Sequence, residues 1–376
     1  MNIILFDSED LRKQLKPFTL TRPISELRTG VLTITEKWRC FFPDSSVSVQ
    51  SSIYIMEKYQ LVHDNDNVFI NGSILPNNQL VDEISSVKMG EGLIQNGEIV
   101  AFRSSSFMSM YEVKIKATKA EFKKIDRAWD LVKYNAQEIV NDIKLLGLKS
   151  TSYTDNNTST YGSEIYIGKN CVIRNAVLNA SKGAIVIEDD VEVSEFAVIH
   201  GPVVIKKRSV ISIGAKIRNN VSIGENCVVG GEVKDSVIFN NSNKAHEGYL
   251  GNSVVGEWCN FGAGTNVSNL KNTLSNVRVW DFSRHEFIDS GQQKLGLIMG
   301  DYSMTAVGTN FMTGSTVGVS ANIVEVPKKY TPSFTWSSQE KYNFDKVVKK
   351  SQEFARLKGG ELSDAEILIL EYICTF

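Results

Sequence analysis

The chain has 376 residues, of which 42% are hydrophobic and 22% charged, and its formal net charge is −2. These values are typical of globular proteins, and the length predicts two or three folded units. There is no long basic stripe, the apolar run at the start is too short for a signal peptide, and no run of 18 apolar residues occurs, so we expect a cytoplasmic protein with no nucleic-acid partner and no membrane contact.

Residues 1–115 have the pattern of a mixed α/β domain. Met1–Phe6 is an apolar run that ends at Asp7 and predicts a strand. Leu27–Phe42 carries apolar residues at helical spacing and predicts a helix, and Val68–Leu75 predicts a strand followed by a turn.

Residues 116–160 predict a helical connector followed by a linker. Apolar side chains recur near helical spacing between Glu121 and Leu146. Leu148–Tyr161 is rich in serine, threonine and asparagine, which is typical of a connecting segment.

Residues 161–326 carry a six-residue repeat of aliphatic side chains, which predicts a parallel β-helix. A heptad or an ordinary helix would drift out of phase with this spacing. The uninterrupted run consists of Ile187, Val193, Ile199, Ile205, Ile211, Ile217, Ile223 and Val229. The period is lost at about 234–252 and 270–298, where the coil must extrude a loop or change a corner. Loops on a rigid scaffold often carry binding groups, although a long surface insertion can also be neutral.

Residues 327–376 predict an arm of extended and helical segments. Phe344–Leu357 and Ala365–Ile373 have helical patterns, and Ser363 with Glu366 forms a capping-box sequence before the second of them. We expect this arm to pack on a neighbouring subunit or domain.

The first interruption contains His246, one of only four histidines, with Lys234 and Tyr249 nearby. Acyl transfer from a thioester to an amine needs a base near neutral pH and hydrogen-bond donors for the carbonyl oxygen. A histidine with amide and phenol neighbours could supply both. By chemistry alone, a surface histidine in a polar loop is the simpler interpretation.

The spacing in this region resembles that of the bacterial bifunctional N-acetylglucosamine-1-phosphate uridyltransferase and glucosamine-1-phosphate acetyltransferase family. Glu232-Val-Lys234 is followed twelve residues later by His246, then by the string H-x-x-Y-L-G and by N-F-G-A-G-T from Asn260. Asn269 lies nine residues after Asn260, as in the family. The similarity extends over about 40 residues, from Glu232 to Leu270.

The resemblance implies an acetyl-CoA-dependent acetyltransferase acting on a sugar phosphate, on a left-handed coil that forms a homotrimer. By position, His246 corresponds to the general base, Lys234, Tyr249 and Asn260 correspond to sugar-phosphate-binding residues, and Ala263 and Asn269 correspond to acetyl-CoA-site residues. Arg218 stands where the family has a phosphate-binding arginine, without a motif to anchor it. Leu270 and Ser275 depart from the family pattern, so the identity of the sugar and the residues that bind the acyl donor stay open.

The N-terminal domain lacks the glycine-rich loop of the uridyltransferase half, since no glycine precedes Gly30. Its string from Phe18 to Gly30, together with N-G-x-x-L-P at 71–76, is similar to that of divergent sugar nucleotidyltransferase-like proteins. That resemblance implies a nucleoside triphosphate as substrate and Mg²⁺ as cofactor. The predicted site residues are Arg22, Arg28, Lys37, Asn71 and Gly72 for the nucleotide and Asp7 for the metal.

Three functions remain open on the sequence. The first is a bifunctional transferase that makes UDP-N-acetylglucosamine for the cell envelope. The second is a protein with one of the two activities and a degenerate partner domain. The third is a non-enzymatic hexapeptide scaffold, against which His246 and its neighbours at family spacing argue.

Overall fold

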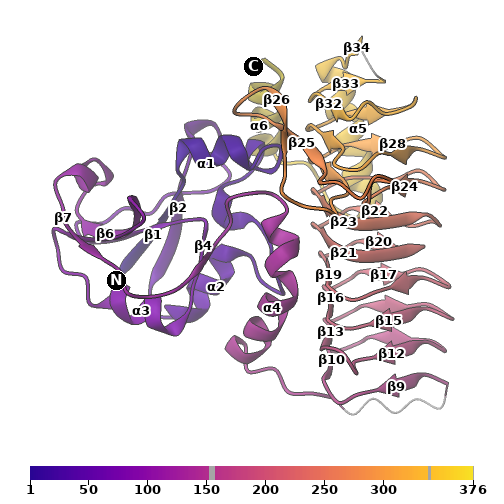
Figure 1. Cartoon of the computed structure of the whole chain (residues 1–376), viewed down its shortest axis with the longest axis horizontal. Coiled ribbons are helices and arrows are strands. Elements are labelled where there is room, and N and C mark those ends of the chain that lie inside the picture. The colour runs from indigo at the N-terminus through magenta and orange to yellow at the C-terminus, as the bar shows by residue number, and fades with distance from the viewer. Residues whose placement is uncertain (152–156, 338–339, 376) are drawn as a thin grey trace.

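A computed structural model describes residues 1–151, 157–337 and 340–375. An α/β domain lies beside a tall β-helix, whose coils are stacked from β9 to β34, and the C-terminal helices lie at the end of the stack that is completed last (Figure 1). The predicted architecture, an α/β domain followed by a left-handed parallel β-helix and a helical arm, is confirmed.

The N-terminal domain is built on a six-stranded mixed sheet with the order β2-β1-β3-β6-β5-β7. Its central strand β1 is parallel to β2 and β3, so the carboxyl ends of these three strands form one edge, where ligands of such sheets usually bind. All five residues of β1 are buried, as its unbroken apolar run predicts. The strands are β1 (Asn2–Phe6), β2 (Ser46–Gln50), β3 (Asn67–Asn71), β5 (Glu91–Gln95), β6 (Glu98–Ser104) and β7 (Lys114–Ala117).

Helices and short 3-10 turns surround this sheet. The helices are α1 (Glu9–Gln14), α2 (Ile34–Phe41), α3 (Asn78–Ser85) and α4 (Asp130–Leu145), and the 3-10 turns are η1 (Phe18–Leu20), η2 (Ile24–Glu26), η3 (Ile53–Ile55) and η4 (Phe107–Tyr111). A two-stranded ribbon pairs β4 (Ile74–Leu75) with β8 (Lys123–Lys124).

Two predicted helices begin later than expected. The helix predicted from Leu27 starts at Ile34, because Thr33 caps it with a capping box and Gly30 adopts a left-handed φ of 87° just before. The helix predicted from Glu121 starts at Asp130, since residues 123–124 form β8 instead. The strands predicted at Met1–Phe6 and Val68–Leu75 are present as β1 and as β3 with β4.

The β-helix has three walls of short parallel strands, and most coils contribute one strand to each wall. Wall A contains β10 (Ile165–Ile167), β13 (Ile185–Ile187), β16 (Val203–Ile205), β19 (Val221–Ile223), β27 (Ile298–Met299), β30 (Thr316–Val317) and β32 (Tyr330–Thr331). Wall B contains β11 (Val172–Ile173), β14 (Glu192–Val193), β17 (Val210–Ile211), β20 (Val228–Val229), β22 (Asn243–Lys244), β28 (Met304–Thr305), β31 (Asn322–Ile323) and β33 (Thr335–Trp336), with β34 (Glu340–Lys341) paired to β33. Wall C contains β9 (Ser159–Tyr161), β12 (Val177–Asn179), β15 (Val198–His200), β18 (Lys216–Ile217), β24 (Asn266–Val267) and β29 (Asn310–Phe311).

The interior of the coil holds the predicted aliphatic residues. Each of the eight positions from Ile187 to Val229 is at most 1% exposed. The first coil strand, β9, lies within the segment predicted as a linker, so the coil begins earlier than the sequence indicated. Residues 152–156 of that linker lie outside the described residues.

The two interruptions of the period have different structures. At the first, β21 (Glu232–Ile238) and β23 (Tyr249–Val255) each run unbroken from wall C into wall A, so the coil changes a corner rather than extruding a loop. The coil is therefore shorter at this point: Val221 pairs with Val203 of the coil before it and with Ser236 of the coil after it. At the second, the chain leaves the coil and forms the antiparallel hairpin of β25 (Arg278–Asp281) and β26 (Glu286–Asp289).

Wall A is covered by the N-terminal domain. Outward-facing Val186 and Val204 pack with α4 residues, and Val237 and Val254 join the core of the N-terminal domain. Figure 1 shows α4 between the sheet and the coil. The middle residue of several wall A strands is apolar because the outer face of this wall is buried as well as its inner face.

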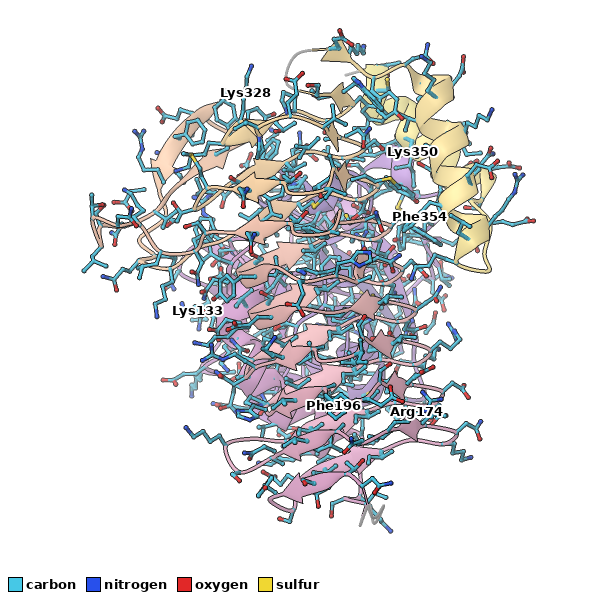
Figure 2. The ribbon with its side chains drawn as sticks, turned by 90° about the vertical axis from the view of Figure 1, so that its right-hand side faces the viewer. Lys133, Arg174, Phe196, Lys328, Lys350 and Phe354 are labelled. Atoms are coloured by element: carbon cyan, nitrogen blue, oxygen red, sulfur yellow. The ribbon has the colours of Figure 1, made fainter. Side chains whose placement is uncertain are left out.

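The C-terminal arm packs on its own chain. The helices α5 (Phe344–Leu357) and α6 (Asp364–Thr375) are present as predicted, and the Ser363–Glu366 capping box forms. Figure 2 shows Lys350 and Phe354 directed from α5 toward the last coils, where Lys350 donates to the carbonyl of Tyr302 at 2.7 Å. Within the described residues, no helix is both long and apolar enough to cross a bilayer.

Candidate functional site

The outer face of wall C carries a polar group of predicted site residues. Val233 and Leu250 point into the coil, so their neighbours Lys234 and Tyr249 point outward from adjacent strands. Arg218 lies on the preceding coil, where its backbone amide donates to the carbonyl of Val233. The register therefore places these three side chains on one surface, and their role in binding a sugar phosphate stays a prediction.

Two of these cations have acidic neighbours on the same face. Arg218 donates to Glu232 at 2.6 Å, and this bond raises the pKa of the arginine. Lys234 lies 3.3 Å from Asp235. Both pairs are at least partly exposed, so an incoming phosphate could compete for the two cations at little free-energy cost.

Tyr249 is held by amides and by a glycine. Its hydroxyl accepts a hydrogen bond from the Asn269 amide at 3.2 Å, and Asn269 also donates to Asn252 at 2.6 Å. The ring lies over Gly251, where a Cβ would come within 2.2 Å of the tyrosine hydroxyl. The glycine of the H-x-x-Y-L-G string is therefore needed for the tyrosine to adopt this position.

His246 lies exposed at the corner between wall B and wall C. Among the described residues its ring has no hydrogen-bond or ion-pair partner, so it is free to meet a substrate. Its backbone is held from inside the coil, because the Nζ of Lys244 donates to the carbonyl of His246 at 2.5 Å and to that of Gly230 at 3.3 Å.

Lys244 is a feature that the sequence prediction missed. It pairs in register with Val229 of the previous coil and is 2% exposed, so it takes the place of an inward aliphatic residue. Burial lowers its pKa to about 8. The break in the aliphatic period at this position was the available signal, since the position fifteen residues before it is Val229.

Asn260 and Ala263 lie apart from the wall C group. Asn260 belongs to wall B, where it bridges Asn243 and Met304. Ala263 lies at the corner between walls B and C, and its carbonyl accepts from the backbone amide of Gly308 at 2.8 Å. One copy of the chain therefore brings together the residues on wall C and the corner, but not Asn260.

Asp7 lies just after the carboxyl end of β1 in the N-terminal domain, and its side chain is buried. Its carboxylate accepts from the backbone amide of Ile24 at 3.1 Å, from Arg12 at 2.8 Å and from the hydroxyl of Ser51. Burial raises the pKa of Asp7, whereas Arg12 opposes that shift. With both oxygens engaged, this carboxylate does not fit a Mg²⁺ ligand, and no cluster of three potential metal ligands occurs among the described residues.

The predicted nucleotide-binding cations do not meet on one surface. Arg22 is buried against Asp301 and Glu257 of the coil, the latter at 3.3 Å. Arg28 donates to the carbonyl of Val31 at 2.6 Å. Their binding of a nucleotide stays a prediction, because each is already engaged within the protein.

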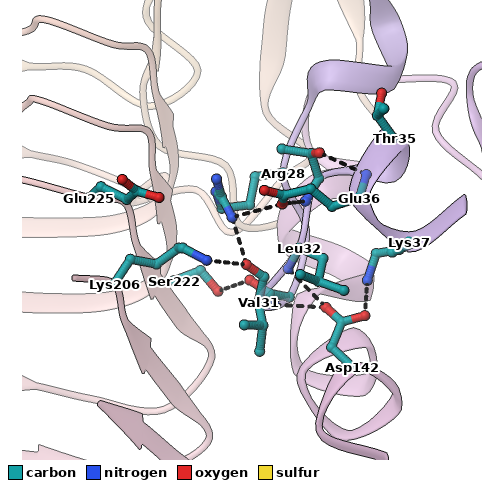
Figure 3. A network of polar contacts seen from close by, with 12 residues as sticks. Arg28, Val31, Leu32, Thr35, Glu36, Lys37, Asp142, Lys206, Ser222 and Glu225 are labelled. Carbon is teal, nitrogen blue, oxygen red and sulfur yellow. Dashed lines mark hydrogen bonds and ion pairs between the residues drawn. The ribbon is translucent and has the colours of Figure 1, made fainter. Parts of the chain in front are cut away.

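Lys37 is the third of these cations and forms ion pairs with α4. It contacts Asp142 (Figure 3), and its Nζ lies 3.0 Å from the carboxylate of Glu138. Burial raises the pKa of Asp142 to about 6, and Lys37 opposes this shift. The network continues to the coil through Lys206, which donates to the carbonyl of Val31 at 3.2 Å (Figure 3).

Asn71 is the last residue of β3 and Gly72 follows it, at the same sheet edge as Asp7. The Asn71 side chain accepts from the backbone and hydroxyl of Ser73, and Gly72 donates to the carbonyl of Phe6 at 2.8 Å. A Cβ at Gly72 would lie 3.2 Å from that carbonyl, so the glycine allows the two strand ends to approach.

Comparison with known proteins agrees with this architecture. Residues 3–151 match the family described as sugar nucleotidyl transferase. The chain is 36% identical over 144 residues to the bifunctional sugar-1-phosphate nucleotidylyltransferase/acetyltransferase of Sulfurisphaera tokodaii, an alignment that covers 38% of this chain and 35% of that protein. It is 31% identical over 196 residues to the bifunctional protein GlmU of Methanococcus aeolicus, covering 52% of this chain and 41% of the relative.

A longer alignment at lower identity links both halves of the chain to such a protein. The bifunctional protein GlmU of Clostridium kluyveri is 27% identical over 274 residues, covering 69% of this chain and 56% of the relative. The chain thus spans between about a third and just over half of the length of these curated relatives. The solved structure of the polySia specific acetyltransferase NeuO overlaps with 54% of this chain and 100% of its own, at a TM-score of 0.33 and 15% identity. The resemblance to bifunctional sugar-phosphate transferases is confirmed.

Proposed function

We propose that this protein is a bifunctional sugar-phosphate transferase, with acetyl transfer on the β-helix and nucleotidyl transfer in the N-terminal domain. The product of the two steps is UDP-N-acetylglucosamine, and glucosamine-1-phosphate with acetyl-CoA and UTP are the substrates. The proposed domains are the nucleotidyltransferase-like domain (1–115), the connector (116–160), the β-helix (161–326) and the C-terminal arm (327–376). The proposed location is the cytoplasm, where these substrates are found.

The observation that carries the acetyltransferase part is the free, exposed imidazole of His246, at the corner that leads into the strand carrying Tyr249. In the proposed reaction His246 takes a proton from the sugar ammonium, and the amine attacks the thioester carbonyl. As the carbon–sulfur bond breaks, the attacking nitrogen loses its second proton and becomes the amide. One of the two protons goes to the thiolate, so that CoA leaves as its thiol, and the other is released to solvent. The amide of Asn269, already donating to Tyr249, is placed to position the acyl donor.

The sugar phosphate would bind on wall C. Lys234 and Arg218 supply positive charge there, each held by a carboxylate that a phosphate can replace. Asn260 would complete the site from a second copy, since within one chain it lies on another wall.

A homotrimer is consistent with the exposed apolar residues at the B–C corner. Phe196 and Ile213 are both 65% exposed, and Val307 is 78% exposed. Phe196 is visible on the outer surface of the coil in Figure 2. Contact with neighbouring copies along this corner would bury these three side chains.

For nucleotidyl transfer, the sugar phosphate would attack the nucleotide's α-phosphorus in line, and pyrophosphate would leave. The family match of residues 3–151 supports this half of the proposal. Because Asp7 does not fit a metal ligand, no step is assigned to Mg²⁺ here.

The test of the acetyl-transfer half is the variant His246→Ala. Release of free thiol from acetyl-CoA, with glucosamine-1-phosphate as acceptor, should fall to background while the unfolding midpoint stays unchanged. His200→Ala is the matched control, since His200 is exposed on wall C of an earlier coil and should leave turnover intact. Unchanged turnover in His246→Ala would refute the assignment.

The nucleotidyl half needs its own assay. Incubation with UTP, Mg²⁺ and N-acetylglucosamine-1-phosphate should release pyrophosphate. If the acetyl assay succeeds and no nucleotide gives pyrophosphate, the protein is a single-activity acetyltransferase. If neither assay succeeds, the coil is a scaffold.

A further inference from the structure

A cavity of about 900 Å³ lies where the N-terminal domain, the last coils and α6 meet. Ser52, which follows β2, and Glu9, which follows β1, line one side of it. The cavity therefore borders the carboxyl edge of the parallel strands, the usual ligand-binding edge of such sheets. Figure 1 shows α1, α6 and the β25–β26 hairpin gathered at this place.

Aromatic side chains from three separate parts of the chain line the cavity. Tyr54 of η3 and Tyr372 of α6 are stacked with their ring centroids 4.1 Å apart. Tyr330 of the coil and Phe282 of the hairpin tip contact each other edge to face at 5.7 Å. Tyr372 remains 40% exposed, so these walls offer flat apolar faces to a ligand.

One cation in the cavity lacks a partner. Lys16 is half-buried and has no hydrogen bond or ion pair among the described residues. Burial lowers its pKa, Arg12 and Lys13 act in the same direction, and Glu9 opposes them. A half-buried ammonium that no carboxylate contacts directly is stabilised when an anionic ligand binds beside it.

Arg12 also lines the cavity, but its guanidinium is already occupied. It donates to Asp7 at 2.8 Å, to Ser51 at 2.6 Å and to the hydroxyl of Tyr54 at 3.1 Å. These bonds hold Tyr54 in place as one wall of the cavity. Lys16 is thus the half-buried cation that is available to an incoming anion, and Lys341 lines the same cavity as an exposed one.

We propose that this cavity binds a nucleoside phosphate, with the phosphate beside Lys16 and the base against the ring of Tyr372. A volume of about 900 Å³ is sufficient for such a ligand. The inference rests on the proposed nucleotidyl-transfer function and gives that function a binding site. The site is shared between the two halves of the protein, because Tyr330 and Tyr372 come from the coil and the C-terminal arm.

The test is calorimetric titration of the full-length protein with UTP. Lys16→Ala should weaken binding at least about tenfold, the effect of losing one charge-assisted contact. Tyr372→Ala should weaken it about fivefold or more, through loss of stacking. Lys13→Ala is the matched control, because Lys13 is exposed nearby on α1 and should bind UTP as the wild type does. The unfolding midpoint of each variant checks that it is folded, and Lys16→Gln replaces Lys16→Ala if the latter is not.

Two results would separate this inference from the proposed function. If the wild type binds UTP and the Lys16 and Tyr372 variants bind it equally well, the cavity is not the nucleotide site, while nucleotidyl transfer stands. If the wild type binds no UTP, both the cavity and the nucleotidyl half of the proposed function are refuted. Titration with CoA is the second arm, and an equal loss of CoA binding in Lys16→Ala would assign the cavity to the acyl donor and overturn the inference.

Discussion

Lys244 places a charged group in the apolar interior of the coil, and its replacement should stabilise the protein while slowing acetyl transfer. The side chain is 2% exposed, and burial lowers its pKa from 10.5 to about 8. This change corresponds to roughly 3 kcal/mol by which the charged ammonium destabilises the native state at neutral pH.

The effect has a definite pH dependence. Below pH 8 the lysine is protonated in both the folded and the unfolded chain, so the whole penalty is present. Between pH 8 and 10.5 the unfolded chain binds more protons, and the free energy of unfolding of the wild type rises with pH. Above that range both forms are neutral and the penalty is gone.

Lys244→Met removes the charge and fills the position with an apolar side chain of similar length. The carbonyls of His246 and Gly230 lose their donor, which offsets part of the gain, so we expect a net stabilisation of about 1–2 kcal/mol at pH 7. Acetyl transfer should fall about tenfold, because the carbonyl of His246 is no longer held.

The measurement is urea unfolding of the wild type and Lys244→Met between pH 7 and 10. Lys216→Met is the control, since Lys216 is exposed on the outside of the coil and should show no pH-dependent difference from the wild type. A difference between the wild type and Lys244→Met that stays constant across this range would refute the reasoning. Unchanged turnover in Lys244→Met would show that the lysine does not hold the His246 corner.

Two further substitutions test the contacts around the site and between the domains. Asp301→Asn should lower the free energy of unfolding by about 3–5 kcal/mol, because Arg22 would stay buried without its nearest carboxylate, and urea unfolding at wild-type level would contradict that role. Gly248→Ala should lower the melting temperature and reduce acetyl transfer, since Gly248 has φ of 124° and a Cβ would lie 2.0 Å from the carbonyl oxygen of Thr265. A folded, fully active Gly248→Ala protein would show that the corner tolerates another path.

The coil could be predicted from the sequence because its interior is determined by side chains at a fixed spacing. Each coil repeats the same local packing, so the inward position of Ile187 or Ile205 can be predicted from its neighbours in the sequence alone. Lys234 and Tyr249 could be named from the spacing of their motif, but their place on wall C depends on the pairing of β21 with β23, which the sequence did not indicate.

The N-terminal cations could not be placed in the same way. Whether Arg22 faces solvent or a carboxylate depends on Asp301, which is 279 positions away. Lys37 likewise depends on residues of α4. A positive charge in a sequence does not say whether its partner is a ligand or another side chain, and here the carboxylates were supplied by segments distant in the chain.

The contact between Arg22 and Asp301 also has a consequence for the order in which the chain assembles. The N-terminal domain is synthesised first, yet its Arg22 and Ile55 are covered by Asp301 and by α6, which are synthesised near the end. Until Asp301 is made, the buried Arg22 lacks its nearest carboxylate, whereas the apolar surface that meets wall A is covered earlier, as Val186, Val204 and Val237 are added. We therefore expect the isolated segment 1–151 to aggregate, and the nascent N-terminal domain to depend on chaperones until the last coils emerge from the ribosome.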